Sequence, residues 1–129
     1  MGPILVDTHA FLWFVFDDRR LSTQAGQVLA DPAQNKVLSM ASLWEVAVKV
    51  SIGKLSLGMS FSDFTDASVT SRELQVLTIG LPHLTEYAQL PLHHRDPFDR
   101  VLIAQAKVEE LPVLTSDERF SAYGIETLW

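Results

Sequence analysis

The sequence predicts an α/β protein with a parallel central sheet, and two features of its pattern carry that prediction. Short, fully apolar runs recur along the 129 residues, and segments with helical spacing separate them. Apolar runs without polar alternation are typical of strands covered on both faces, and strands joined through helices favour parallel order with right-handed crossovers. We therefore expect one domain over residues 1–129.

The composition fits a globular protein of this size. Hydrophobic residues make up 47% and charged residues 20%, which are ordinary values for a chain with a single core. The absence of cysteine excludes a disulfide framework, a thiolate zinc site and a cysteine nucleophile, and it suits a reducing cytoplasm. The net charge of −6 has the wrong sign for a broad basic surface that holds nucleic acid. The apolar run 4–16 is too short to span a bilayer, so we expect a cytoplasmic protein without a membrane anchor.

The first element is predicted to be a central strand that ends in an acid. Residues 4–6 are fully apolar, and Asp7 and Thr8 follow at once. Ligands of open parallel sheets bind at the carboxyl ends of the strands, which is where Asp7 would lie. Residues 10–16 are apolar all round and predict a helix that is deep in the core or covered by another subunit. We favour a dimer contact for this helix.

The next segments continue the alternation. Residues 17–20 predict a solvated turn, 22–30 a short helix ended by Asp31-Pro32, and 36–39 a second strand. A further helix is expected to begin at Ser42 and to end at Gly53.

Glu45 in that helix has two structural explanations. Ser42 and Glu45 fit a capping box, in which a hydroxyl and a carboxylate three residues apart satisfy the first turn. Glu45 also precedes Lys49 by four residues, the spacing of a helical ion pair. Taken alone, these patterns favour a structural role for Glu45.

The later elements follow the same logic. We expect a weak helix over 61–74, a strand over 76–79, a short helix over 82–90, a strand over 113–115, an irregular turn over 119–123 and an edge strand over 125–128. The strand at 113–115 ends in Ser116 and Asp117. This repeats the arrangement at Asp7, an apolar strand with an acid at its carboxyl end and a hydroxyl beside it.

The clearest helix signal lies in the run HRDPFDRVLIAQA, residues 94–106. Asp96 suits the N-cap and Pro97 the first turn. Asp99 heads an apolar stripe that continues through Leu102, Ile103 and Ala106. A carboxylate above a buried stripe is costly unless positive charge meets it, and a helix N-terminus supplies only ~0.3–1 kcal/mol. A pair of helix-capping acids and a functional site explain this run equally well.

Four acids are expected to meet at one edge of the sheet: Asp7, Glu45, Asp99 and Asp117. The first and last end strands, and the other two lie in the first turns of helices, which share that edge. Unit charges about 4 Å apart repel by ~4 kcal/mol at an effective dielectric near 20, so the cluster makes sense if it holds hard cations. Oxygen ligands favour Mg²⁺ or Mn²⁺, as one or two ions, over zinc. Such ions activate water and stabilise the leaving oxygen of a phosphodiester.

These segments resemble a PIN-domain ribonuclease. The resemblance is carried by Asp7-Thr8-His9, Trp44-Glu45, the run 94–106 and Thr115-Ser116-Asp117, and it covers the chain from Asp7 to about Phe120. More narrowly, the segments are similar to VapC-type toxins of bacterial type II toxin–antitoxin systems. The resemblance implies a three-layer α/β/α sandwich, a metal-dependent endoribonuclease, a homodimer and a VapB-like antitoxin partner.

The resemblance also implies residue roles. It makes Asp7, Glu45, Asp99 and Asp117 the catalytic, metal-binding acids, which reverses the structural interpretation of Glu45. Asp96 is a helix cap or binds the metal through water, and Thr8 and Ser116 orient the acids or cap locally. Candidate phosphate contacts are Arg95, Arg100 and Lys49, with Lys54 and Arg119 also near the motifs. The histidines are interpreted as groups at the surface or around the acids, with a general base as the alternative.

Two other functions compete with an RNA-cleaving toxin. A receiver-like, metal-binding signalling module needs an acid ending a middle strand and a lysine ending a late one. Here the candidate middle strands end without Asp, and Lys107 lies within a helix. An inactive PIN-like binding subunit would lack one of the acids, and none is missing.

Overall fold

A computed structural model describes residues 2–129 and contains a five-stranded sheet in the order β3-β2-β1-β4-β5. The strands are β1 (Ile4–Val6), β2 (Lys36–Ser39), β3 (Gln75–Leu77), β4 (Val113–Leu114) and β5 (Thr127–Leu128). Every neighbouring pair is parallel, so the predicted parallel α/β fold is confirmed. Receiver domains have the strand order 2-1-3-4-5. The observed order therefore makes the receiver-like interpretation wrong.

Helices connect the strands. They are α1 (Thr8–Val15), α2 (Thr23–Ala30), α3 (Met40–Ser51), α4 (Phe61–Thr65), α5 (Leu81–Ala88) and α6 (Pro97–Glu109). A π-helical turn η1 (Asp66–Thr70) continues α4, and a 3₁₀ turn η2 (Ser121–Tyr123) precedes β5. The expected helix over 61–74 is therefore too long, because its α-helical part ends at Thr65. No helix within residues 2–129 is long and apolar enough to cross a membrane.

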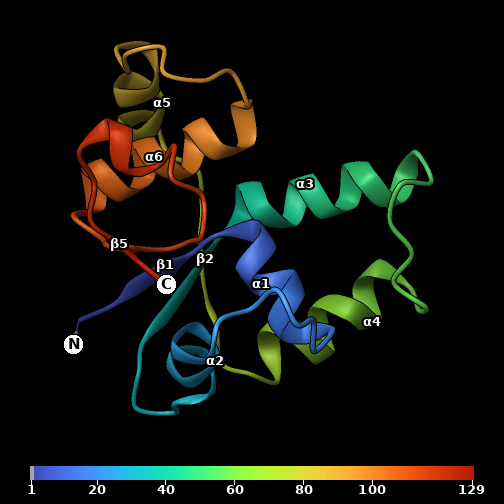
Figure 1. Ribbon diagram of the computed structural model, residues 1–129. Coiled ribbons are helices and arrows are strands. Elements are labelled where there is room, and N and C mark those ends of the chain that lie inside the picture. The colour runs from blue at the N-terminus through green and yellow to red at the C-terminus, as the bar shows by residue number, and fades with distance from the viewer. Residues whose placement is uncertain (1) are drawn as a thin grey trace.

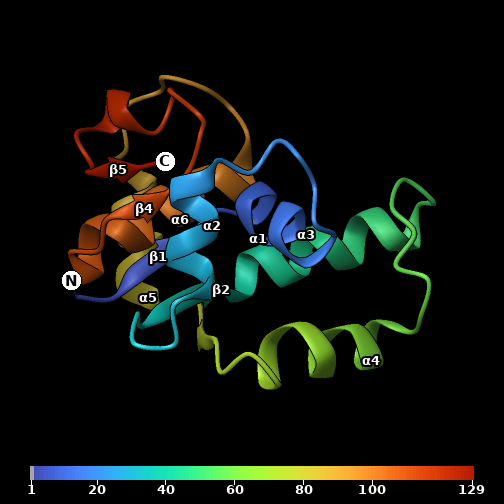
Figure 2. The same cartoon turned by 60° about the horizontal axis from the view of Figure 1, so that its bottom comes forward.

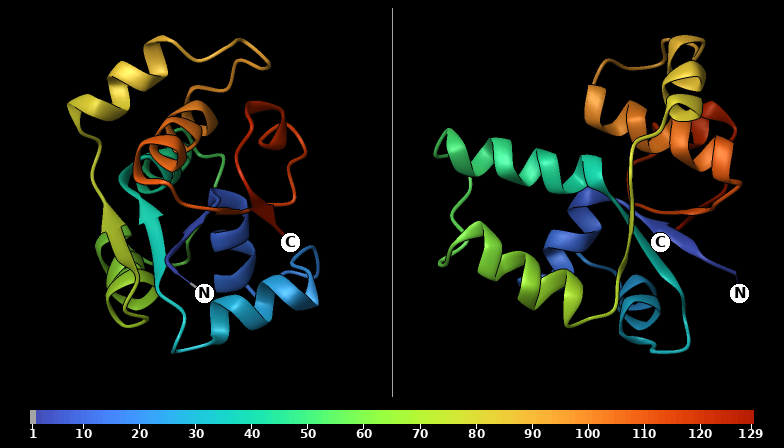
Figure 3. Two further views of the ribbon diagram at one scale, coloured as in Figure 1. Left: turned by 90° about the vertical axis from the view of Figure 1, so that its left-hand side faces the viewer. Right: turned by 180° about the vertical axis from the view of Figure 1, so that it is seen from behind.

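The sheet lies between two layers of helices. Ile4 and Val6 face a core cluster with side chains of α1, α2, α3 and α4, whereas Leu5 faces a second cluster built on α6. Successive strand residues point to opposite faces, so this alternation fits a strand covered on both sides. Figures 1 and 3 show α5 and α6 on one side of the sheet and α1, α2 and α4 on the other. The α/β/α sandwich is confirmed.

The start of α3 differs from the sequence prediction. The helix begins at Met40, and the hydroxyl of Ser39 caps it by accepting the N–H of Ala41 at 3.0 Å. The capping box of Ser42 and Glu45 is therefore wrong, since β2 runs into α3 with no loop between them. Glu45 lies in the second turn of α3 instead of the first. The ion pair of Glu45 with Lys49 is confirmed, at 2.8 Å.

The ends of two other helices agree with the sequence prediction more closely. Asp96 caps α6, and its carboxylate accepts the N–H groups of Phe98 at 2.9 Å and Asp99 at 3.2 Å. Helix α1 begins at Thr8, two residues earlier than expected, and ends at Val15, one residue before Phe16. It buries Phe11 and leaves Phe16 exposed. The apolar segment therefore has a core face and an outer face, and its role in a dimer stays a prediction.

Candidate active site

The sheet brings the ends of β1 and β4 side by side. Asp7 follows β1, and its N–H donates to the carbonyl of Leu114 in β4 at 3.1 Å. Thr115 and Asp117 follow β4 directly. The strand order reverses between these two strands, because β2 lies on one side of β1 and β4 on the other. In open α/β sheets this is the position of the ligand crevice.

Helices α3 and α6 add two more acids at this edge. Helix α3 follows β2, which neighbours β1, and it packs against α6. Glu45 of α3 and Asp99 of α6 are both buried. The charges of Glu45 and Asp117 raise the pKa of Asp7, and those of Asp7 and Asp117 raise the pKa of Asp99. The structure therefore places the four predicted acids close enough for their charges to influence one another.

Asp7 is the most deeply buried of these acids. Only 3% of it is exposed, and burial raises its pKa from the ordinary 3.8 to about 6. The Thr115 hydroxyl donates to Asp7 Oδ2 at 2.8 Å, which partly opposes that rise. Asp7 Oδ1 is buried and has no hydrogen-bond partner within residues 2–129. A buried, unpaired carboxylate oxygen is costly unless a proton or a cation meets it.

The carboxylate of Asp99 is held by the imidazole of His94. Burial, followed by the charge of Asp96, raises the pKa of Asp99 to about 7. Nε2 of His94 lies 3.2 Å from Asp99 Oδ2, and this hydrogen bond opposes the rise. Nδ1 of His94 lies 2.8 Å from the Tyr123 hydroxyl, so both ring nitrogens have partners. This contact fixes the histidine ring against Asp99.

Arg119 joins two of the acids. Its guanidinium donates to both oxygens of Asp117, at 2.7 to 3.2 Å, and this hydrogen bonding lowers the pKa of Asp117. One guanidinium nitrogen also lies 3.9 Å from Asp99 Oδ2. Arg119 itself is exposed. The guanidinium of Arg119 therefore already neutralises part of the negative charge at this edge of the sheet.

The donor set fits a hard divalent cation, although the ligands are not arranged around one. Within residues 2–129, no three His, Asp or Glu side chains converge in a ready-made metal-binding group. The contacts explain this, because Arg119 holds Asp117 and Lys49 holds Glu45. The donors are carboxylate oxygens, which Mg²⁺ and Mn²⁺ prefer. Oδ1 of Asp7 has no hydrogen-bond partner among the described residues, so it is free to act as a ligand.

The hydroxyl beside Asp7 is Thr115, a residue that the sequence analysis did not select for the site. Its Oγ1 donates to Asp7 and accepts the N–H of Asp117 at 3.0 Å. Ser116 is exposed, and the Thr8 hydroxyl donates to Ser42 Oγ at 2.7 Å instead of to an acid. No local sequence pattern indicates this contact, which arises because the parallel register of β1 and β4 places Thr115 next to Asp7.

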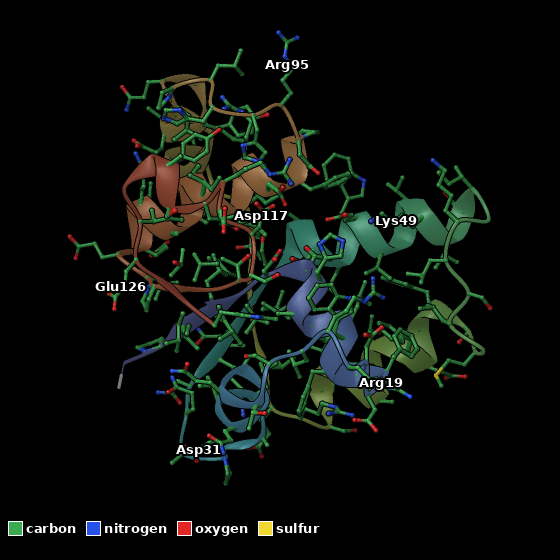
Figure 4. All side chains as sticks on the ribbon, in the orientation of Figure 1. Arg19, Asp31, Lys49, Arg95, Asp117 and Glu126 are labelled. Atoms are coloured by element: carbon green, nitrogen blue, oxygen red, sulfur yellow. The ribbon has the colours of Figure 1, made fainter. Side chains whose placement is uncertain are left out.

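The predicted phosphate contacts separate into different environments. Arg100 is buried, and its Nη1 donates to Pro91 O, His94 O and the Tyr123 hydroxyl. It holds the loop before α6, so we no longer expect it to contact phosphate. Figure 4 shows Arg95 projecting outward from that loop, away from Asp117, and Lys49 on α3. Lys49 is partly exposed and Arg119 more so.

Two of the histidines are not surface groups. His94 lies against Asp99, as described above. His83 is buried, where its Nδ1 accepts the N–H of Gly80 at 2.9 Å and its Nε2 lies 3.0 Å from Glu109. It stabilises the start of α5 and takes no part in the acid cluster.

A family model of the PIN domain matches residues 4–126. The chain belongs to the PIN domain family. The match includes all four acids and the strands that present them. No curated protein matches the chain in sequence.

Solved structures with the same fold as this PIN domain include components of toxin–antitoxin systems. The structure of VapBC2 from Rickettsia felis, bound to a DNA fragment from its promoter, has a TM-score of 0.71 at 13% identity, covering 98% of this chain and 97% of that one. The structure of Mycobacterium tuberculosis VapC20, a sarcin–ricin loop cleaving toxin, has a TM-score of 0.67 at 19% identity, covering 95% of each chain. A toxin–antitoxin complex from Klebsiella pneumoniae has a TM-score of 0.67 at 18% identity, covering 98% and 96%. At these identities the likeness establishes the fold.

Proposed function

We propose that this PIN domain is a metal-dependent endoribonuclease and the toxin of a VapBC-type toxin–antitoxin system. The observation that carries the proposal is the cluster of buried acids around Asp7, with one carboxylate oxygen unpaired. A cluster of this kind stores electrostatic repulsion that a divalent cation relieves. The family match and the likeness to VapC20 indicate RNA as the substrate.

Asp7, Glu45, Asp99 and Asp117 would hold one or two Mg²⁺ or Mn²⁺ ions. Bound there, the metal supplies water activation and charge stabilisation for phosphodiester hydrolysis, with 5′-phosphate and 3′-hydroxyl products expected from the family resemblance. The protein's contribution is to hold the acids in place. Strand β1 and the Thr115 hydroxyl fix Asp7.

The remaining acids are positioned by their own partners. His94 fixes Asp99 from one side, and Lys49 fixes Glu45. Asp96 caps α6 and so fixes the position of Asp99 in the first turn of that helix. Arg119 lies among these acids as an exposed cation, so it is suited to contact a phosphate oxygen once the metal has taken Asp117.

An antitoxin resembling VapB is the proposed partner, and a homodimer is the proposed assembly. The support is that similar folds occur in complexes named VapBC2 and FitAB, both bound to DNA. The net charge of −6 is compatible with this function because the ions neutralise the acid cluster. An antitoxin can then inhibit by covering the acids or by contributing a basic side chain to them.

The test is to map new 5′ ends in bacterial total RNA after incubation with purified protein and Mn²⁺. Asp99→Asn, which removes one carboxylate and keeps its shape, and an EDTA-treated sample are the parallel reactions. Asp18→Asn is the matched control, because Asp18 pairs with Arg20 and does not influence the pKa values of Asp7, Asp99 or Asp117. We expect sharp ends with the wild type and the control variant that vanish in the other two samples.

The result that contradicts the proposal is a set of ends common to wild type and Asp99→Asn while calorimetry shows that the wild type binds Mn²⁺. The metal would then serve a binding function. Loss of cleavage in Asp99→Asn with unchanged circular dichroism assigns the loss to the site instead of the fold.

A further inference from the structure

We propose that Trp44 and Phe98 form a stacking platform for an unpaired nucleobase next to the acid cluster. This inference rests on the proposed function, and it names the part of the RNA that the site recognises. The two rings lie 4.9 Å apart between centroids at an angle of 71°. Trp44 immediately precedes Glu45 on α3, and Phe98 immediately precedes Asp99 on α6. The aromatic pair therefore bridges the same two helices that supply two of the acids.

Trp44 is unusual for its helix. It is 55% exposed, and it is the only exposed residue over the stretch Ala41–Val50. A tryptophan in a structural role hides most of its large apolar surface. The edge-to-face contact with Phe98 engages at most one face of the indole, so it anchors the ring while leaving aromatic surface open. A held but uncovered aromatic ring is the feature on which nucleobases stack.

The charge of the protein favours a base as the occupant. With a net charge of −6, the chain cannot hold RNA through many phosphate contacts, and the cations near the acids, Lys49 and Arg119, are themselves paired. Stacking gains affinity without positive charge and tolerates any base sequence. Base stacking therefore supplies affinity that this acidic protein cannot obtain from phosphate contacts.

Stacking on Trp44 also requires that the RNA be unpaired at that base. In a double helix each base is already stacked on its neighbours, and sequence-specific recognition of RNA targets loops and single strands with splayed bases. A base on Trp44 must therefore come from a loop or a single strand. Because Trp44 and Phe98 lie in the same helical turns as the proposed metal ligands Glu45 and Asp99, we expect that base within a few nucleotides of the cleaved phosphodiester.

Two fluorescein-labelled oligomers separate base stacking from phosphate binding. One is a ten-residue oligoadenylate, and the other is a ten-residue abasic ribose-phosphate chain with the same charge. Their affinities are measured by fluorescence anisotropy with Mn²⁺, using Asp99→Asn as the parent so that the RNA stays intact. Trp44→Ala and Trp44→Phe are built on this parent. Leu84→Ala is the matched control, because Leu84 is a similarly exposed apolar residue (50%) on α5.

We expect Trp44→Ala to weaken oligoadenylate binding by about 5- to 150-fold, which is the range that the loss of one base–aromatic stack produces. Trp44→Phe keeps a ring and should lose less than about threefold. Leu84→Ala should match the parent. The abasic chain should bind weakly, with the same affinity for every variant, because it offers no base to stack.

Equal oligoadenylate affinity in the parent and in Trp44→Ala overturns the platform. If Trp44→Ala also elutes at a lower mass than the parent, the exposed indole belongs to a contact between protein chains. Failure of the proposed function has a different signature, since wild-type protein would then produce no metal-dependent ends in total RNA. Oligoadenylate binding that depends on Trp44 without such ends supports the platform and contradicts the nuclease.

Discussion

Without divalent metal, this PIN domain should lose stability as the pH rises from about 4 to 7. Burial raises the pKa of Asp7 to about 6 and that of Asp99 to about 7, both from an ordinary 3.8. The folded state then binds protons more tightly than the unfolded chain does. Over this window, ionising the two acids costs the folded state more than the unfolded state, so the free energy of unfolding falls with rising pH.

The size of the fall in the free energy of unfolding is set mainly by Asp7, the more buried of the two acids. Raising a carboxyl pKa from 3.8 to about 6 corresponds to about 3 kcal/mol for Asp7 alone. Asp99 adds to this fall in the free energy of unfolding, but by less than its own pKa suggests, because part of the rise in its pKa comes from the charge of Asp7. The fall is complete above the higher pKa of about 7.

The measurement is urea denaturation of EDTA-treated protein at pH 4, 5, 6 and 7, with the free energy of unfolding obtained by linear extrapolation. Asp99→Asn should show a smaller fall, because one of the two acids no longer ionises. Asp18→Asn should show the full fall, since the hydrogen bonds from Arg20 lower the pKa of Asp18 to about 2, below the window. At pH 7, Mn²⁺ at about 100 times its Kd should restore about 2.7 kcal/mol in the wild type.

The electrostatic argument is wrong if metal-free wild type becomes more stable between pH 4 and 7. It is also wrong if Asp99→Asn shows the same fall as the wild type. Either result would mean that burial and the neighbouring charges do not raise the pKa values of Asp7 and Asp99 in the folded protein.

Three further substitutions test individual contacts. Thr115→Val should lower the free energy of unfolding by about 2 kcal/mol in urea denaturation, because Asp7 loses its buried hydrogen-bond donor. The same variant should cleave RNA less well, whereas Thr115→Ser should keep both the stability and the cleavage. Asp96→Ala should cost about 1 kcal/mol through loss of the helix cap, and Asp96→Ser should restore stability and cleavage unless Asp96 also binds the metal through water. Arg119→Ala should tighten Mn²⁺ binding about tenfold in calorimetry, since Asp117 loses its competing cation; an unchanged affinity would show that Arg119 moves away at no cost.

The sequence was sufficient for the fold because the central strands β1, β2 and β4 are short and buried along their whole length. The apolar runs at Ile4–Val6 and Lys36–Ser39 have the bounds that the pattern predicts. The acids could also be located, because acids that end parallel strands share an edge regardless of how the helices pack. Asp7 and Asp117 needed no knowledge of tertiary contacts.

The misplaced start of α3 shows where local patterns fail. Ser39 and Ser42 are both acceptable N-caps, and the sequence favoured Ser42 because Glu45 completes a capping box. Strand β2 ends at Ser39 with no intervening loop, so the helix starts as soon as the strand stops. Ser42 is thereby buried and bonds Thr8, a contact 34 residues away in sequence that no local pattern contains. Thr115 was missed for the same reason, since its partner Asp7 is 108 residues away.

The order in which the acids occur along the chain has a consequence for protein synthesis. Asp7 leaves the ribosome first and Asp117 last, and the strand that positions Asp117 pairs with β1, the first strand made. The sheet around Asp7 cannot close, and Thr115 cannot bond its carboxylate, until residues 113–117 have emerged. A nascent chain on which translation stops before β4 therefore carries three of the four acids and no assembled cluster. A chain cut before β4 should therefore be unable to cleave RNA, because it lacks both Asp117 and the hydroxyl that bonds Asp7.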